Sequence, residues 1–138
     1  MPTLTRRIRF RASHRYRRAA WSEADNRRVF GEQGRSHEHD WTVDVTVRGR
    51  LDSATGWTVD LGVLDARLGE IRDRLAGRDV AEALPDFGPS GLQPSTEELA
   101  RWFWSQVAGR LPDDVALVRV RVAESDDLWA ECSVEAGP

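Results

Sequence analysis

The sequence is poor in cysteine, lacks lysine and contains no long apolar segment. Its single cysteine, Cys132, excludes a disulfide within the chain. No apolar run approaches the roughly 20 residues that cross a bilayer, and the arginine-rich start lacks the apolar stretch of a signal peptide. We therefore expect a cytoplasmic protein with no membrane partner.

The charge of the chain is unevenly distributed. All 20 basic residues are arginine; residues 1–50 carry 12 of them against 6 acidic residues, whereas residues 51–138 carry 8 against 17. A basic first third is compatible with binding of nucleic acid or of a phosphorylated ligand. However, Arg7, Arg9 and Arg11 alternate with apolar residues, which is typical of the solvent face of a half-buried strand. With a pI near 5.6, we expect no nucleic-acid partner.

Length and periodicity predict a single domain spanning residues 1–138. A chain of this length buries one core. Alternating, β-branched segments predict four strands, over residues 4–14, 37–51, 115–124 and 128–135. Apolar residues at helical spacing predict two helices, one from the cap Asp60 to Gly77 and one from the cap at Ser95 or Thr96 to Leu111.

The order ββααββ, with both strand pairs joined locally, predicts an α+β domain. Its four-stranded antiparallel sheet would carry two helices on one face, and its open edges predict a homo-oligomer. Residues 15–33 have no clean period and are expected to be irregular, and residues 78–94 are rich in turns. The predicted buried stripes of the two helices are Leu61, Leu64, Leu68, Ile71 and Leu75, and Leu99, Trp102, Phe103, Val107 and Leu111.

The three histidines of the chain are all placed at ends of predicted strands. His37 and His39 stand two apart at the head of one strand, so their side chains share a face. His14 ends the first strand. If the two strands pair, the imidazoles converge and leave a fourth position open, as at a catalytic zinc site. An isolated H-x-H is more simply two exposed histidines, but here every histidine fits one Zn2+ site.

Six short stretches occur together in one order and spacing. They are Phe10-x-Ala12-Ser13-His14, Asn26-x-x-Val29-Phe30-Gly31, His37-x-His39-x-Trp41, Thr55-Gly56-Trp57-x-Val59-Asp60-Leu61, Pro94-x-x-Glu97-x-Leu99-Ala100 and Val120-x-Val122-x-Glu124-Ser125. Over nearly the whole chain this combination resembles the 6-pyruvoyl-tetrahydropterin synthase / 6-carboxytetrahydropterin synthase family.

The resemblance implies the tunnelling fold, in which such subunits join their sheets into a barrel and assemble as trimers or hexamers with active sites at subunit interfaces. It also implies a small-molecule substrate, Zn2+ bound by the three histidines, and Glu124 gripping the guanidine-like edge of a pterin. Ser95 and Thr96 fall in the stretch that lines the same pocket, and Gln33 is assigned with them to substrate binding.

Two departures from the family concern proton transfer. Gln33 stands where family members carry a proton-abstracting cysteine, and an amide cannot act as a general base. The family's Asp-His pair aligns with Ala76 and Gly77; a slip of one or two residues recruits Asp79, but no histidine. Cys132 lies far away in the last predicted strand and is expected to be a small buried residue.

A glutamate near the metal is the candidate replacement for the missing base. Glu32 is the first candidate, because some family members are thought to use glutamate in place of the cysteine. Glu38 is the second, since strand alternation points it away from the metal. The alternative for both is an ordinary surface glutamate.

Two functions follow from these residues. The first is a zinc-dependent lyase of carbon–oxygen or carbon–carbon bonds, or a cyclase, with altered catalytic groups, acting in a biosynthetic pathway on dihydroneopterin triphosphate, dihydroneopterin or a non-standard substrate. The second is a catalytically inactive tunnelling-fold protein that binds a pterin-like or purine-like ligand or a protein partner.

Overall fold

The computed structural model describes residues 1–135, which form a five-stranded open sheet with helices. The strands are β1 (Thr3–His14), β2 (His37–Gly49), β3 (Arg78–Asp79), β4 (Val115–Ser125) and β5 (Leu128–Ser133). Their spatial order is β3-β1-β2-β4-β5, with antiparallel pairing between the four long strands. The short β3, which was not predicted, runs parallel to β1 at one edge of this sheet.

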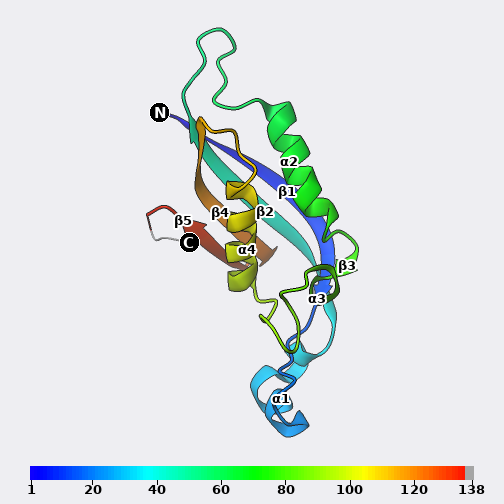
Figure 1. Cartoon of the computed structure of the whole chain (residues 1–138). Helices are drawn as coiled ribbons and strands as arrows, with labels where there is room; N and C mark the ends of the chain where they lie inside the picture. The colour runs from blue at the N-terminus through cyan, green and yellow to red at the C-terminus, as the bar shows by residue number, and fades with distance from the viewer. Residues whose placement is uncertain (136–138) are drawn as a thin grey trace.

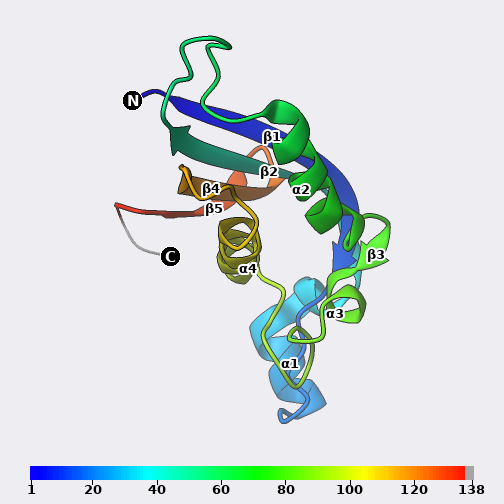
Figure 2. The same ribbon diagram turned by 45° about the horizontal axis from the view of Figure 1, so that its top comes forward.

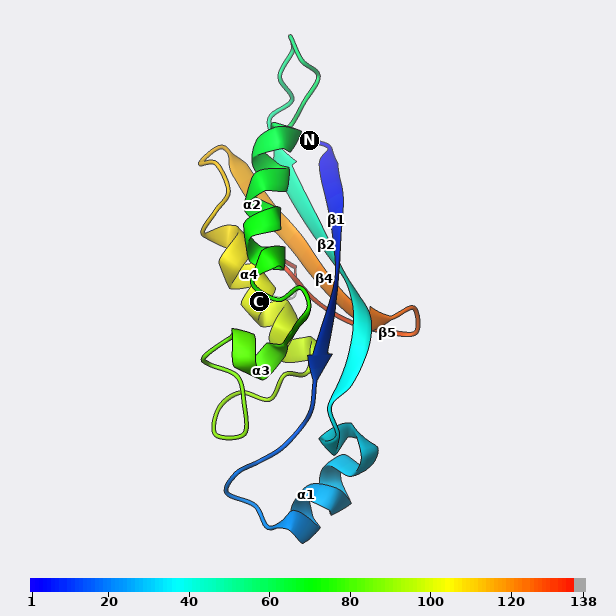
Figure 3. The ribbon, with the colours of Figure 1, turned by 90° about the vertical axis from the view of Figure 1, so that its right-hand side faces the viewer.

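Two helices, α2 (Leu61–Asp73) and α4 (Thr96–Ala108), cover one face of the sheet (Figures 1 and 3). Both begin at predicted caps: the Asp60 carboxylate accepts hydrogen bonds from the backbone of Gly62 and Val63, and the Ser95 hydroxyl accepts one from Glu98. This arrangement confirms the predicted α+β fold. The core between the layers includes Ile8, Phe10, Trp41, Val43, Val45, Leu64, Leu68, Ile71, Leu75, Leu99, Phe103, Val107, Val120 and Val122.

Several element ends differ from the prediction. The helix α2 stops at Asp73, because the chain then turns back to the sheet, where Gly77 has a φ of 74° and donates its N–H to Arg11 O at 2.7 Å. Leu61 is 44% exposed because it is the first residue of α2, next to the loop that enters from solvent.

The strand ends also move inward. β2 ends at Gly49 rather than at residue 51. A Cβ added at Gly49 would lie 2.6 Å from Thr58 O, so the loop that follows folds closely against this glycine. β5 ends at Ser133 rather than at residue 135.

The segment predicted as irregular contains a helix, α1 (Glu23–Phe30), followed by the 3-10 turn η1 (Gly31–Gly34). Ser22 caps α1 by accepting a hydrogen bond from Asp25 N at 3.1 Å. The helix lies beyond the end of the sheet, apart from α2 and α4 (Figure 2). Its packing depends on the buried Asn26 and on stacked rings, so it shows no apolar stripe in the sequence. A further short helix, α3 (Val80–Ala83), lies in the turn-rich stretch.

The described part of the chain has no helix that is long and apolar enough to cross a membrane.

Candidate metal and ligand site

The pairing of β1 with β2 brings the three histidines together. In this antiparallel register His14 faces His37 and Ala12 faces His39. Directly opposed residues share a face of the sheet, so the three imidazoles lie on the helix-covered side. One ligand atom from each ring lies within 4.8 Å of those from the other two. The structure thus forms one cluster from all the histidines of the chain.

Backbone carbonyls fix the tautomers of two of these imidazoles. His14 Nδ1 lies 2.7 Å from Pro94 O, and His37 Nδ1 lies 2.7 Å from Arg35 O. A carbonyl oxygen only accepts, so each Nδ1 carries the hydrogen and each Nε2 presents its lone pair. Carbonyl partners of this kind orient metal-binding imidazoles in proteins.

The inward-facing nitrogens fit a bound metal. The Nε2 atoms of His14, His37 and His39 are buried and form no hydrogen bond among residues 1–135, although the Glu124 carboxylate lies beside those of His39 and His14. Buried polar atoms without a partner are costly and rare in folded proteins. Three neutral imidazole nitrogens directed at one point are a donor set that zinc prefers, with a fourth position left for water or substrate.

His14 is held neutral by its surroundings. Its side chain is fully buried, and burial lowers its pKa from 6.5 to about 4, helped by the neighbouring His37 and His39 and opposed by the hydrogen bond to Pro94. The buried Trp41 ring packs edge-on against His14 and His39, with centroids 5.1 and 5.5 Å apart. Its Nε1 donates to Ala12 O at 3.1 Å, which fixes this apolar floor to β1.

Glu124 places a carboxylate beside the cluster. Its Oε2 lies 3.2 Å from His39 Nε2 and 3.5 Å from His14 Nε2, and its side chain is 14% exposed. The residue lies near the end of β4, where the pairing with β5 shifts register between Ala123 and Ser125. Such irregularities direct side chains at functional sites. The structure therefore brings Glu124 to the three histidines.

Tyr16 is a residue of this site that the sequence analysis missed. Its ring lies 5.4 Å from that of His14 and stacks on Phe30 at 5.6 Å, and Phe30 stacks on Trp21 at 5.6 Å. Burial raises the pKa of Tyr16 to about 12, as do the carboxylates of Glu124 and Glu97, so the phenol is protonated at neutral pH. Its position two residues after His14 is the one signal in the sequence that places it near the histidine cluster.

The three residues assigned to the pocket wall lie in two segments, at the start of α4 and in η1. Ser95 and Thr96 follow Pro94 directly; the Ser95 hydroxyl caps α4, and Thr96 is 2% exposed. Gln33 lies in η1, where its carbonyl accepts a hydrogen bond from Tyr16 N at 3.0 Å.

The two candidate bases lie outside the cluster in the isolated chain. Glu32 lies in η1 with a side chain that is 87% exposed, 3.8 Å from Arg35 Nε. It lines a cavity of about 320 Å³ that Tyr16 also borders. Glu38 is exposed on the opposite face of β2 from His37 and forms an ion pair with Arg11.

Asp79 and Cys132, the other two residues considered for a chemical role, are part of the scaffold. Asp79 accepts a hydrogen bond from the Ser13 hydroxyl at 3.3 Å and caps α3. Cys132 is 6% exposed opposite Val120, and burial raises the pKa of its thiol. This thiol lies in the core, as expected from the sequence.

Comparison with known proteins places the chain among pterin synthases. A family model described as 6-pyruvoyl tetrahydropterin synthase matches residues 3–135. The chain is 33% identical over 127 residues to the 6-pyruvoyl tetrahydrobiopterin synthase of Homo sapiens, covering 90% of this chain and 86% of that protein. It is 31% identical over 125 residues to the protein of the same name from Drosophila melanogaster, covering 88% and 73%.

Solved structures share the fold. The 6-pyruvoyl tetrahydropterin synthase of Caenorhabditis elegans superposes with a TM-score of 0.86 at 21% identity, covering 96% of this chain and 94% of that one. A Plasmodium vivax 6-pyruvoyltetrahydropterin synthase, described as a mutant with a catalytic glutamate replaced by cysteine, gives 0.65 at 14% identity and covers 95% and 97%. Together with the sequence matches, these likenesses show that the chain belongs to the 6-pyruvoyl tetrahydropterin synthase family.

Proposed function

We propose that this chain is a zinc-dependent lyase or cyclase of the pterin-synthase type whose proton-transfer groups differ from those of the family. The observation that carries the proposal is the convergence of three histidines with buried, unpartnered Nε2 atoms. Membership of a family whose relatives are named 6-pyruvoyl tetrahydrobiopterin synthases supports the class of reaction.

His14, His37 and His39 would hold the ion through their Nε2 atoms. When bound, zinc supplies a Lewis acid that polarises a carbonyl or hydroxyl oxygen of the substrate. The chain keeps His14 neutral by burial and orients two of the imidazoles, because Pro94 O and Arg35 O accept hydrogen bonds from their Nδ1–H groups. The cluster sits over an apolar floor made by Trp41, which strengthens electrostatic interactions by excluding water.

Glu124 is proposed to bind the guanidine-like edge of a pterin. Adjacent N–H groups on such an edge match a carboxylate through two parallel hydrogen bonds. A ligand held by Glu124 would lie beside the metal-facing nitrogens, because its Oε2 is 3.2 Å from His39 Nε2. Ser95, Thr96 and Gln33 are proposed to line the same pocket, next to Pro94 and Tyr16.

Glu32 is proposed as the base that accepts the substrate proton, because the neighbouring Gln33 has no ionisable group. It borders the cavity that also contains Tyr16, whose ring contacts His14. The Plasmodium vivax relative, described as having a catalytic glutamate, supports a carboxylate in this role. Glu38 is the weaker candidate, since its carboxylate pairs with Arg11 on the other face of the sheet.

The test is a turnover experiment with matched variants. Zinc-loaded protein is incubated with dihydroneopterin triphosphate or with dihydroneopterin, and the products are identified by mass spectrometry. The variants are His37→Ala, Glu32→Ala and Glu38→Ala, the last two being equivalent truncations, one in η1 and one in β2. We expect a new product from the wild type and from Glu38→Ala, and none from His37→Ala or Glu32→Ala.

Each other pattern changes one part of the proposal. Product lost in Glu38→Ala but kept in Glu32→Ala would transfer the role of base to Glu38. Product formed equally by His37→Ala would contradict a role for the metal. No product from the wild type with either substrate, although zinc is bound, would exclude both reactions for this chain.

A second candidate function is ligand binding without catalysis. The observation that favours it is the turn at Ala76 and Gly77, where the family carries its Asp-His pair: Gly77 adopts a positive φ of 74° and uses its N–H to anchor the turn to β1. Isothermal titration with dihydroneopterin distinguishes the two. Binding that depends on Glu124, without conversion, would support this candidate.

A further inference from the structure

The dipeptide Gln93-Pro94 contacts both the last residue of β1 and the segment that follows it. The Pro94 carbonyl accepts the hydrogen bond from His14 Nδ1 at 2.7 Å. The Gln93 side chain contacts the backbone three residues further along: its Oε1 accepts from Arg17 N at 3.0 Å, and its Nε2 donates to Arg17 O at 2.9 Å. Gln93 therefore satisfies both polar backbone groups of Arg17, as a paired strand would.

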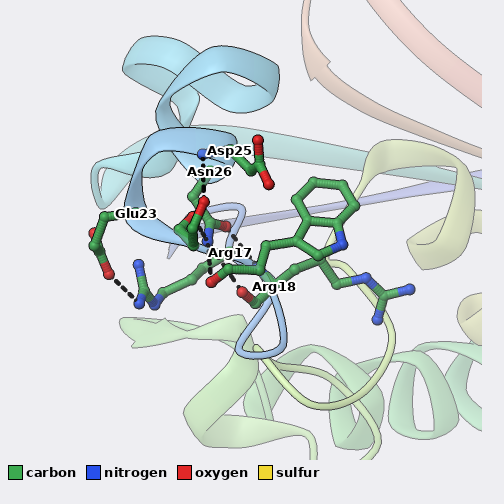
Figure 4. A network of polar contacts seen from close by, with 7 residues as sticks. Arg17, Arg18, Glu23, Asp25 and Asn26 are labelled. Carbon is green, nitrogen blue, oxygen red and sulfur yellow. Dashed lines mark hydrogen bonds and ion pairs between the residues drawn. The ribbon is translucent and has the colours of Figure 1, made fainter.

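Residues 16–18, here called the strap, connect the metal strand β1 to α1 and are fixed from three sides. Tyr16 N donates to Gln33 O at 3.0 Å. The buried Asn26 accepts from Arg18 N at 2.8 Å and donates to Arg18 O at 3.0 Å (Figure 4). Gln93 ties the strap to the loop before α4 through the backbone of Arg17, and Arg18 Nη1 adds an exposed contact to Gly91 O at 3.2 Å. The strap and this loop therefore cannot shift independently while the Gln93 contacts remain.

The position of the Pro94 carbonyl depends on Gln93. A residue that precedes proline is restricted to extended conformations, which limits how the peptide before Pro94 can be arranged. The carbonyl of Gln93 also accepts from Ser95 N at 2.8 Å, at the start of α4. The Gln93 amide is thus the side-chain link to the strap that lies next to the carbonyl that sets the tautomer of His14.

We propose that Gln93 is a positioning residue of the metal site. It fixes the Pro94 carbonyl against His14, so that the proton stays on Nδ1 and Nε2 remains directed at the other two imidazoles. Gln93 acts through Pro94 and His14 and need not touch metal or substrate. The part of this inference that concerns metal affinity rests on the proposed function, whereas the orientation of His14 does not.

The first test is made on the full, metal-free chain by NMR of imidazole and indole N–H protons. A buried Nδ1–H that donates to a carbonyl exchanges slowly with water and gives a resolved signal. In Gln93→Met, an uncharged change of similar length, we expect the exchange rate of the His14 Nδ1 proton to rise about tenfold or more. The Trp41 Nε1 proton is also buried and donates to Ala12 O at 3.1 Å, so it should keep its exchange rate and serves as an internal control.

Two further variants separate positioning from general destabilisation. Gln106→Met removes a glutamine of α4 whose Oε1 accepts from Arg74 and Arg110 far from the strap, and it should leave the His14 proton unchanged. Gln93→Glu keeps the acceptor for Arg17 N but sets a carboxylate oxygen against Arg17 O, so the exchange rate of the His14 proton should rise at least as much as in Gln93→Met.

The second measurement is metal binding, by zinc competition with a chelator and by the absorption spectrum of Co2+-loaded protein. Loss of such supporting contacts typically lowers metal affinity about 10- to 100-fold. We expect Gln93→Met to lower the affinity for zinc at least about tenfold and to alter the Co2+ spectrum. Gln106→Met should change neither.

The two measurements fail in different ways. An unchanged His14 proton in Gln93→Met, or equal changes at the His14 and Trp41 protons, would overturn the proposal. Absence of zinc binding in the wild type would instead overturn the proposed function, while the NMR comparison would still decide the role of Gln93.

Discussion

The carboxylate oxygen Oε2 of Glu124 lies 3.2 Å from Nε2 of His39, across the pairing of β4 with β2. One carboxylate is therefore held directly against the histidine cluster. Because Glu124 also lies 3.5 Å from His14 Nε2, its charge contacts two of the three proposed metal ligands. A role as ligand anchor and a role as a further metal ligand make different predictions for its amide variant.

Glu124→Gln is predicted to lose pterin binding and keep zinc. The amide preserves size but offers one acceptor and no charge, so the dissociation constant for dihydroneopterin should rise about 10- to 100-fold. Isothermal titration gives this constant, and elemental analysis gives the zinc content. Glu131→Gln, on β5, is the matched control and should bind as the wild type does. Loss of zinc in Glu124→Gln would show instead that Glu124 ligates the metal.

The stability of the metal-free chain is predicted to decrease as the pH is lowered, because of His14. The pKa of His14 is about 4 in the folded chain and 6.5 in the unfolded chain. Between these two pH values His14 is protonated only in the unfolded chain. The stabilisation is therefore complete above about pH 6.5 and lost as pH falls towards 4, and it amounts to about 3 kcal/mol. Urea unfolding measures it. His14→Asn keeps a donor for Pro94 O without titrating, so its pH profile should be flatter; parallel profiles would contradict this origin.

Asn26→Asp is predicted to destabilise α1. The Asn26 Nδ2 group donates to the carbonyls of Arg18, Trp21 and Ser22 at 3.0 to 3.3 Å, and a carboxylate would oppose these oxygens without a hydrogen to share. We expect a loss of about 3 kcal/mol and faster proteolysis within residues 15–36. The exposed neighbour provides the control: Asp25→Asn should change stability by less than about 0.5 kcal/mol. An equally small effect of both variants would show that the hydrogen bonds of Asn26 (Figure 4) contribute little to stability.

Cys132→Ala is predicted to keep full turnover. The thiol is buried opposite Val120 and its pKa is raised, so it is neither accessible nor activated as a nucleophile. In the folded wild type a thiol reagent should react slowly, and the rate should rise on unfolding in urea. Rapid labelling of the native protein, or inactivation by this substitution, would assign Cys132 a chemical role.

The sequence was sufficient to predict the parts of the fold that depend on periodicity. Alternation along β1, β2 and β4 and the stripe of α4 are properties of local spacing, and the pairing of His14 with His37 follows once two such strands are antiparallel. α1 was missed because it is held by Asn26 and by stacked rings rather than by an apolar stripe. β3 was missed because two residues are too few to show a period.

The missing parts of the site are backbone groups and distant contacts. The carbonyls of Pro94 and Arg35 orient the histidines, but any residue type supplies a carbonyl, so no sequence pattern marks them. The contacts of Gln93 with Arg17 join residues that are 76 positions apart, which only the folded chain brings together. The resemblance located Glu124, whereas its closeness to His39 required coordinates.

The most direct test of the central claim is the zinc content of the purified chain and its variants. We predict one equivalent of zinc in the wild type and in Glu38→Ala, and loss of the metal in His14→Ala, His37→Ala and His39→Ala. The control lies between two of the histidines but faces the other side of β2. Equal zinc in the histidine variants and the wild type, or none in any of them, would contradict a three-histidine metal site.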